Sequence, residues 1–336
     1  MTLLWLGKET SAGTGGDDIY EIKTKKALDD AGRSVTSLFV PKVSRARRIF
    51  NFLTGKPYYR ELYFQPDIAA KVTQMAPQFE RVIISWEPMD IYALCGTVQK
   101  TLILHNVTSD AVRQIFPGRF LANLLSRYAR IWEAHIYNSD KVRSIVVLSK
   151  RDRSIVQEIA PKKPVFVAPP GAPPATDLSP AGLLRCELVI SGTFDWFPKK
   201  RDMQKFDREF AEAGLTYPVL TDGAQIGDGD VRFGVITDRF AAGHKLKTMF
   251  YIANNCVVLS YCDVSSDFED LPFSSRFIRR VENAAQLNSA IQSLKEQWND
   301  ELCGAFSIFK SACLARFSWK NTAAEIEGAL GVGKPR

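Results

Sequence analysis

The sequence predicts an α/β protein made of two Rossmann-like domains. Short apolar runs of strand length alternate with helical periodicity over the first 168 residues, and the same alternation begins again after residue 182. Residues 169–182 contain five prolines and two glycines without periodicity, which is typical of a hinge. The predicted domains therefore cover residues 1–168 and 183–317. A chain of 336 residues is long enough for each domain to bury its own core.

The first domain is expected to open with a strand, a glycine-rich loop, a helix and a second strand. The loop includes Gly15 and Gly16, and the helix runs from Asp17 or Asp18 to Ala31. This order is typical of a doubly wound sheet, although the third glycine and the acidic residue of a dinucleotide site are missing. A tight turn would explain the glycines equally well. The strands expected in this domain cover residues 3–6, 34–40, 81–85, 100–105, 145–148 and 165–168.

Residues 111–143 are predicted to form a long helical region that is broken near Pro117 and Gly118. Its apolar residues recur on one face, and we assign that face to core packing rather than to a membrane. They are Ile115, Phe116, Leu121, Leu124, Leu125, Tyr128 and Ile131.

The second domain repeats the alternation of strands and helices. A helix is expected to start at Pro198, and the tail is predicted to be helical from Glu282 onward. The expected strands cover residues 186–191, 217–220, 231–237 and 256–259.

Several polar residues follow predicted strands of the first domain, where open α/β sheets bind their ligands. His105 and Asn106 end the strand at 100–105, Glu87 follows the preceding strand, and Asp17 and Asp18 lie after the first. Each also has a structural explanation, because lone histidines are often buried in cores and Asp17 suits a helix N-cap.

The stretch from Gly243 to Ser260 organises the second domain. Gly243 is expected to open a helix whose apolar residues lie three, four and seven positions apart, followed by a buried parallel strand. The backbone N–H groups at Gly243 and His244, with Lys245, Lys247 and Thr248, would suit a phosphate group. An ordinary packed helix with solvated lysines is the alternative.

Composition excludes several kinds of protein. Six cysteines without a CxxC pair favour reduced thiols in the cytosol. Three scattered histidines and the absence of a convincing DxD motif argue against a metal site, so we expect no metal. The N-terminus does not resemble a signal peptide, and no stretch has the ~20 apolar residues of a membrane-spanning helix.

Residues 42–60 hold much of the net charge of +7. They include six basic residues and no acidic one, and aromatic residues are interleaved with them. Arg45, Arg47, Arg48, Phe50 and Phe52 would suit an anionic bilayer surface. Single-stranded nucleic acid is a weaker alternative, since only this stretch supports it, and a solvated basic loop is another.

The motifs along the chain resemble those of GT-B glycosyltransferases, in particular the retaining family four that builds bacterial polysaccharides and lipid-linked glycans. The resemblance covers nearly the whole length and depends on the order and spacing of the motifs. They are GTGGDDIYEIKTKKALDDAG, LILHNVTSD, VVLSKRDRSIV, VFVAPPGAPP, LVISGTFDWFPKKRDM, GHKLKTMFYIANNCVVLS and FSWKNTAAEIEGAL. It implies two Rossmann-like domains that face a central cleft, and a last helix, residues 318–332, that packs back on the first domain.

The sequence departs from the family pattern at one important place. Two glutamates, eight positions apart, normally contact the donor sugar and its ribose, and here Ala242 and Phe250 occupy those positions. Lys247 does match a lysine often found in this helix. The sequence alone therefore leaves open whether transfer retains or inverts the anomeric configuration.

The resemblance implies roles for individual residues. Catalysis would involve His105, Lys247 and Asp18, with Asp17 or Asp18 as the base of an inverting reaction. The acceptor would meet residues of the first domain, namely Gly15, Gly16, Asp17, Glu87 and Asn106. The nucleotide sugar would meet Gly192, Thr193, Phe194, Trp196, Lys199, Gly243, His244, Lys245, Thr248 and Tyr251.

The leading functional hypothesis is sugar transfer from a nucleoside diphosphate sugar to a glycan or lipid-linked acceptor, without a further cofactor. The enzyme would work in the cytoplasm, peripheral to the inner face of the cytoplasmic membrane. One alternative is an inverting enzyme that resembles the xanthan glucuronosyltransferase group. Another is a non-catalytic protein that binds a nucleotide sugar. The sugar, the nucleotide, the acceptor and the oligomeric state are not determined by the sequence.

Overall fold

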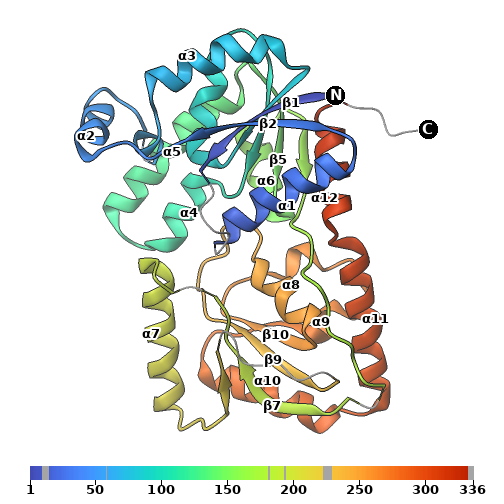
Figure 1. The fold of residues 1–336 in the computed structure, drawn as a ribbon. Helices are drawn as coiled ribbons and strands as arrows, with labels where there is room; N and C mark the ends of the chain where they lie inside the picture. The colour runs from blue at the N-terminus through green and yellow to red at the C-terminus, as the bar shows by residue number, and fades with distance from the viewer. Residues whose placement is uncertain (10–14, 58, 181, 193, 222–228, 332–336) are drawn as a thin grey trace. The chain divides into compact units, whose positions relative to one another are not determined.

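The computed structural model describes residues 1–336 except 10–14, 58, 181, 193, 222–228 and 332–336. The chain divides into two compact units (Figure 1). Unit 1 contains residues 1–170, 242–244 and 319–336, and unit 2 contains residues 171–241 and 245–318. Each unit has one parallel sheet with helices packed against it, which confirms the predicted fold class.

The sheet of unit 1 has the strand order β2-β1-β3-β4-β5-β6, and every neighbouring pair is parallel. Its strands are β1 (Thr2–Lys8), β2 (Ser34–Val40), β3 (Arg81–Ser85), β4 (Lys100–Leu104), β5 (Val142–Val147) and β6 (Val165–Val167). Helices cover both sides of the sheet, so the central strands are buried on both faces. Strands in this position have continuous apolar runs, such as LIL in β4.

The helices of unit 1 are α1 (Gly16–Asp30), α2 (Arg45–Leu53), α3 (Pro66–Met75), α4 (Thr108–Ile115), α5 (Phe120–Tyr137), α6 (Lys150–Ile159) and α12 (Trp319–Ala329). The last of these comes from the far end of the chain. Glu327 of α12 pairs with Arg33 at 2.5 Å, and the ring of Trp319 lies 6.1 Å from that of Tyr20 in α1. Helix α12 thus completes the core of unit 1 on the α1 side of the sheet.

The sheet of unit 2 has the order β11-β10-β9-β7-β8, again with parallel neighbours. The strands are β7 (Leu184–Val189), β8 (Val219–Leu220), β9 (Val231–Ile236), β10 (Cys256–Ser260) and β11 (Ile278–Arg280). The helices are α7 (Phe197–Glu212), α8 (Leu246–Ala253), α9 (Ser274–Phe277), α10 (Ala284–Gln297) and α11 (Asp300–Arg316). One large core joins the sheet to α8, α10 and α11.

The structure corrects two expectations about unit 1. Residues 45–53 form a helix, α2, so the alternative of a solvated loop does not hold for them, and Arg60 from the basic stretch is buried in an ion pair with Asp90. The second correction concerns α5, whose apolar face we assigned to the core. Leu121 and Leu124 are 64% and 54% exposed, whereas Ala122 and Ala129 of the same helix are buried.

A 3-10 helix, η3 (Glu87–Leu94), connects β3 to β4. Among the described residues, no helix combines the length and the apolar content needed to cross a membrane.

Candidate functional site

The carboxyl ends of three neighbouring strands of unit 1 carry the polar residues that the sequence singled out. Strands β1, β3 and β4 are adjacent and parallel, so the segments that follow them leave the same edge of the sheet. Glu87 follows β3 and His105 follows β4, while Asp17 and Asp18 lie in the first turn of α1, after β1. The fold therefore brings Asp17 and His105 together across 88 positions of sequence.

His105 lies at the centre of this cluster and is buried. Its Nδ1 is 3.5 Å from Oδ1 of Asp17, and its Nε2 is 3.4 Å from Oγ of Ser85. The ring of Tyr20 packs edge-on against the imidazole, with the centroids 4.9 Å apart. Burial acts to lower the pKa of His105, but the hydrogen bond to Asp17 and the nearby carboxylates outweigh it and raise that pKa. The cluster therefore favours a positively charged imidazole.

Asp17 and Asp18 share the cation of Lys8. Its Nζ lies 2.9 Å from Oδ1 of Asp18 and 3.5 Å from Oδ2 of Asp17. Burial acts to raise the pKa of Asp17, but His105 and Lys8 outweigh it and lower that pKa to about 2. An acid this strong is a poor general base at neutral pH, so Asp17 is better suited to accept a hydrogen bond from a hydroxyl group. The N-cap of α1 is Gly15, not Asp17, and Gly16 is the first helical residue.

Glu87 is a titratable group of the cluster whose pKa is close to neutral pH. Its side chain is buried, and Oε1 accepts a hydrogen bond of 3.3 Å from the amide of Asn106. Its other oxygen, Oε2, has no hydrogen-bond partner among the described residues. Burial raises the pKa of Glu87 to about 7, against the charge of His105, which acts to lower it. A carboxyl group with this pKa can exchange a proton under physiological conditions.

Two further residues of the cluster were missed by the sequence interpretation. Trp86, between β3 and Glu87, has φ 80°, a conformation that bulky residues rarely adopt and that often accompanies functional sites. Glu21 is fully buried, accepts a hydrogen bond of 2.6 Å from Nε1 of Trp5, and places Oε1 3.9 Å from Nε2 of His105. Glu21 lies four residues after Asp17 on one face of α1, a spacing that could have identified it. No sequence signal marks the backbone of Trp86.

Gly243 belongs to unit 1 by its contacts, as do Ala242 and His244. Its φ is 67°, and a Cβ atom at this position would lie 2.4 Å from the backbone oxygen of His105. Only glycine fits both the conformation and the space. The structure corrects the expected helix start, because α8 begins at Leu246. Gly243 and His244 therefore precede the helix and do not form its first turn.

The candidate anion-binding part of unit 2 lies at the start of α8. Lys245 is the N-cap residue and Lys247 is in the first turn. A buried carboxylate that the sequence interpretation overlooked, Asp238, lies 3.2 Å from Nζ of Lys245 and 3.9 Å from Nζ of Lys247. Burial acts to raise the pKa of Asp238, but Lys245, Lys247 and Lys199 outweigh it and lower that pKa. Three lysines and one carboxylate leave this corner of unit 2 positively charged.

The loop between β7 and α7 supplies neighbours for Lys247. Nζ of Lys247 lies 4.8 Å from the ring centroid of Phe194. Gly192 has φ 113°, and a Cβ atom there would lie 2.6 Å from Cε of Lys247, so glycine allows the lysine to approach the loop. Trp196 is 45% exposed and packs edge-on against Phe240, with the ring centroids 5.5 Å apart. Thr193, which we predicted to bind the donor, lies outside the described residues.

Tyr251 and Thr248 of α8, which we predicted to contact the donor, are both buried. The ring of Tyr251 is fully buried, and its hydroxyl group accepts a hydrogen bond from Ser191 N and donates one to Val235 O. Tyr251 therefore joins the helix to the sheet, and we withdraw it from the site. Thr248 is also buried, but its Oγ1 has no hydrogen-bond partner among the described residues.

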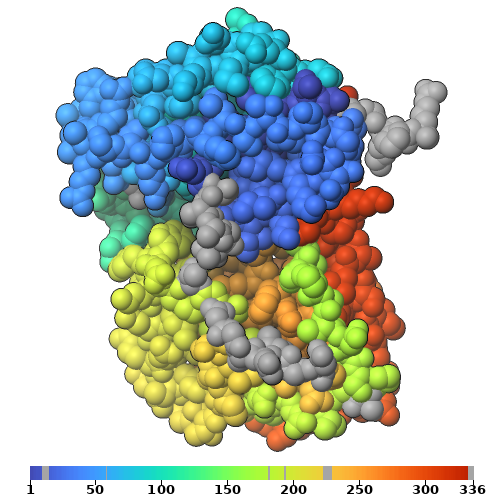
Figure 2. Space-filling model, viewed as in Figure 1, coloured from blue at the N-terminus to red at the C-terminus, as the bar shows by residue number. Residues whose placement is uncertain are grey.

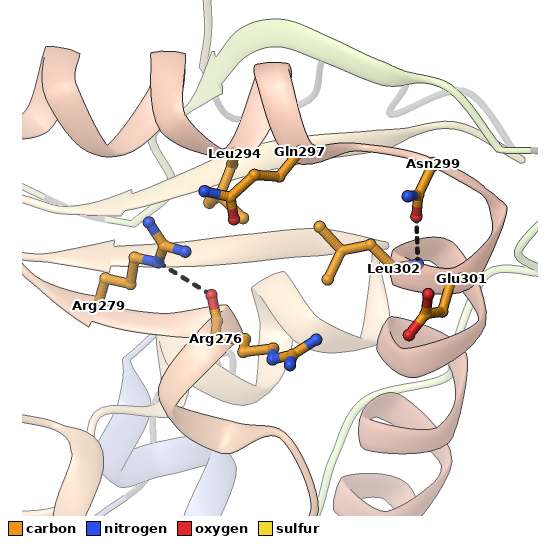
Figure 3. Close-up of a pocket in the computed structure, with 7 residues that line it drawn as sticks. All are labelled: Arg276, Arg279, Leu294, Gln297, Asn299, Glu301 and Leu302. Carbon is orange, nitrogen blue, oxygen red and sulfur yellow. Dashed lines mark hydrogen bonds between the residues drawn. The ribbon is translucent and has the colours of Figure 1, made fainter.

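A pocket of about 250 Å³ lies elsewhere in unit 2 (Figure 3). It is lined by Arg276, Arg279, Leu294, Gln297, Asn299, Glu301 and Leu302. None of these residues was predicted to belong to the site. Arg279 donates to the carbonyl of Arg276, and Asn299 caps α11, so both have structural roles here.

Comparison with known proteins identifies the fold. No protein-family model matches the sequence, and no curated protein matches it significantly. Solved structures do match over nearly the full length. Sucrose-phosphate synthase from Thermosynechococcus elongatus is 12% identical, with 97% of each chain covered and a TM-score of 0.65. Anabaena HepE, solved with UDP and glucose, is 12% identical, with 98% of this chain and 99% of that chain covered and a TM-score of 0.58.

A third match is WaaG, a glycosyltransferase involved in lipopolysaccharide biosynthesis. It is 12% identical, with 98% of this chain and 99% of that chain covered and a TM-score of 0.56. At such identities the likeness establishes the fold alone, which is the GT-B fold that the sequence motifs resemble.

Proposed function

We propose that the protein is a glycosyltransferase that moves a sugar from a nucleoside diphosphate sugar to a glycan or lipid-linked acceptor. The observation that carries the proposal is the group of Lys245 and Lys247 around Asp238 at the start of α8. Positive charge fixed beside a diphosphate stabilises the charge that grows on this leaving group in the transition state. Anabaena HepE, which was solved with UDP and glucose, supports a nucleotide sugar as the donor.

In this proposal unit 1 receives the acceptor. Asp17 is ionised and partly exposed, and it accepts a hydrogen bond from the acceptor hydroxyl. Glu87, whose pKa is about 7, is better matched than Asp17 to take up the hydroxyl proton, with Asn106 orienting its carboxyl group. His105 supplies positive charge that holds Asp17 ionised. Lys245 and Lys247 supply the charge that a metal ion provides in other transferases, so the proposal includes no metal cofactor.

The stereochemical course is a separate question. A proton acceptor with a pKa of about 7 in unit 1 favours inverting transfer, as does the absence of glutamates at Ala242 and Phe250. The overall likeness to retaining enzymes favours retention. The anomeric configuration of the product distinguishes the two, and NMR of the product measures it directly.

The experiment that tests the proposal is donor hydrolysis with a panel of nucleotide sugars, followed by transfer to candidate acceptors. Release of a nucleoside diphosphate that depends on Lys247 supports the proposal. Tight binding of a nucleotide sugar without any turnover would instead establish the non-catalytic alternative. We further propose that the acceptor is carried by a lipid at the inner face of the cytoplasmic membrane, where residues 42–60 of this peripheral protein contact the bilayer.

A further inference from the structure

Helix α5 exposes an apolar face to solvent. Phe120 is 83% exposed, Leu121 64%, Leu124 54% and Ile131 67%. Steps of four and seven residues place Phe120, Leu124 and Ile131 on one side of the helix. The opposite side, with Ala122, is buried. Core packing thus accounts for one face of α5 and leaves the other unexplained.

Helix α2 exposes a second set of apolar side chains. Ile49, Phe50, Phe52 and Leu53 are each between 54% and 76% exposed. The helix is held to unit 1 by Asn51, whose buried amide donates hydrogen bonds to the carbonyls of residues 61 and 64. An asparagine anchor with apolar residues directed outward reverses the usual pattern of a surface helix.

The two helices belong to one surface of unit 1. Tyr128 of α5 donates a hydrogen bond of 3.4 Å to the carbonyl of Gly55, two residues after the end of α2. Figures 1 and 2 show α2 at the outer margin of unit 1. Among the described large apolar side chains that are more than half exposed, eight lie on these helices and three lie elsewhere. Such a concentration usually marks an interaction site.

The charges around this surface have one sign. Neither residues 42–60 nor residues 111–132 contain an acidic residue. Arg45, Arg119 and Arg127 are exposed, and Arg47 is half-buried with its guanidinium over the ring of Phe50. Carboxylates outside these two ranges pair with arginines inside them: Glu61 with Arg48 at 3.4 Å, Asp110 with Arg113 at 2.9 Å, Glu158 with Arg130 at 3.2 Å, and Asp90 with the buried Arg60.

We propose that α2 and α5 together form a docking surface for an anionic lipid bilayer, with their apolar side chains at the level of the acyl chains and the arginines on lipid phosphates. Apolar insertion flanked by basic residues is the chemistry that binds a peripheral protein to such a surface. A second copy of the chain is a poorer occupant, because two identical basic surfaces repel each other. The proposal rests on the membrane contact given under the proposed function and extends it to α5. Its test requires no sugar transfer, so its failure and the failure of the proposed sugar transfer are distinguishable.

Vesicle flotation tests this surface. Wild-type protein is mixed with phosphatidylcholine vesicles, with or without phosphatidylglycerol, and the floated fraction is measured at low and high salt. We expect flotation with phosphatidylglycerol that weakens at high salt. Leu121→Gln with Leu124→Gln is expected to reduce the partition coefficient by at least about tenfold, because two inserted side chains are lost. Arg127→Gln is expected to reduce it by about fivefold.

The matched control is Ile308→Gln, which replaces a side chain of α11 in unit 2 that is 55% exposed. It should float like the wild type. Circular dichroism and urea unfolding confirm that each variant is folded. Equal partitioning of the wild type and the α5 double variant would overturn the proposal. A wild-type dimer that the double variant abolishes, without flotation of either protein, would overturn it in favour of a second copy.

Discussion

Oδ2 of Asp238 lies 3.2 Å from Nζ of Lys245, and neither side chain is more than 10% exposed. Asp238 follows β9 and Lys245 precedes α8, so the ion pair joins the two ends of the segment that connects this strand to this helix. Lys247 lies 3.9 Å from the other oxygen of the same carboxylate. The positive charge at the start of α8 is thus partly neutralised by a group within unit 2, and the predictions that concern the donor depend on this balance.

Replacing Asp238 should destabilise the fold and strengthen anion binding. In Asp238→Asn two nearly buried lysines lose their counterion, so we expect a loss of about 3 kcal/mol in the free energy of unfolding, measured with urea. The net charge facing a ligand rises, so UDP should raise the melting temperature of this variant more than that of the wild type. The control is Glu212→Gln, at the exposed end of α7. Equal thermal shifts would remove Asp238 from the donor site.

The pH dependence of stability should reflect the same pair. Because Lys245 and Lys247 lower the pKa of Asp238, its contribution is fully present above the ordinary pKa of 3.8 and is lost as the pH falls through the lower folded value. Urea unfolding of wild type and Asp238→Asn should therefore converge in strong acid. A difference in the free energy of unfolding between the two proteins that stays the same at every pH would contradict this prediction.

Removing the charge of Lys247 should slow the reaction. In Lys247→Ala the developing charge on the diphosphate loses a fixed cation, so we expect turnover to fall by about a hundredfold. Released nucleoside diphosphate measures the rate. Lys200→Ala, an exposed lysine in the first turn of α7, is the control and should remain near the wild-type rate. An unchanged rate in Lys247→Ala would exclude this lysine from the catalytic machinery.

A methyl group at Gly192 should displace Lys247. In Gly192→Ala the new Cβ would lie 2.6 Å from Cε of Lys247, so the lysine must move. Gly214→Ala is the matched control, because Gly214 also has a positive φ but has open space around it. Both variants should lose about 1–2 kcal/mol of stability to backbone strain. Only Gly192→Ala should also lose turnover, and equal activity of the two would contradict the role of the loop.

Glu87 should make the fold less stable as the pH rises. Its pKa is about 7 in the fold, against 4.5 ordinarily, so the folded protein binds more protons than the unfolded chain between these values. Stability then falls across pH 4.5 to 7, by at most about 3 kcal/mol from this group. Glu87→Gln, which keeps the bond from Asn106, should lose that part of the pH dependence. If the free energy of unfolding changed with pH in the same way in both proteins, the raised pKa of Glu87 would be contradicted.

Chelation should leave the rate unchanged. If Lys245 and Lys247 supply the positive charge at the diphosphate, dialysis against EDTA should not alter donor turnover. Restoration of a lost rate by added Mg²⁺ or Mn²⁺ would show that a metal ion shares this task.

The clearest predictions from the sequence concern buried elements. A strand such as β10, with apolar residues on both faces, is typical of the inside of a parallel sheet, and this is where it lies. Apolar periodicity identified a face of α5 but not what covers that face, and helix α2 was not predicted. The sequence interpretation also missed Glu21, Asp238 and Trp86. The roles of these residues depend on partners or backbone angles that are set by distant parts of the chain.

The sequence by itself determined the two α/β halves and placed Glu87 and His105 just after two consecutive predicted strands, because strand-length apolar runs and the residues that follow them are local patterns. Only the tertiary structure decided the charge of each group. Burial raises the pKa of Glu87, while contacts with His105 and Lys8 lower that of Asp17. Both effects depend on distances between residues that are remote in sequence, and no local pattern encodes those distances.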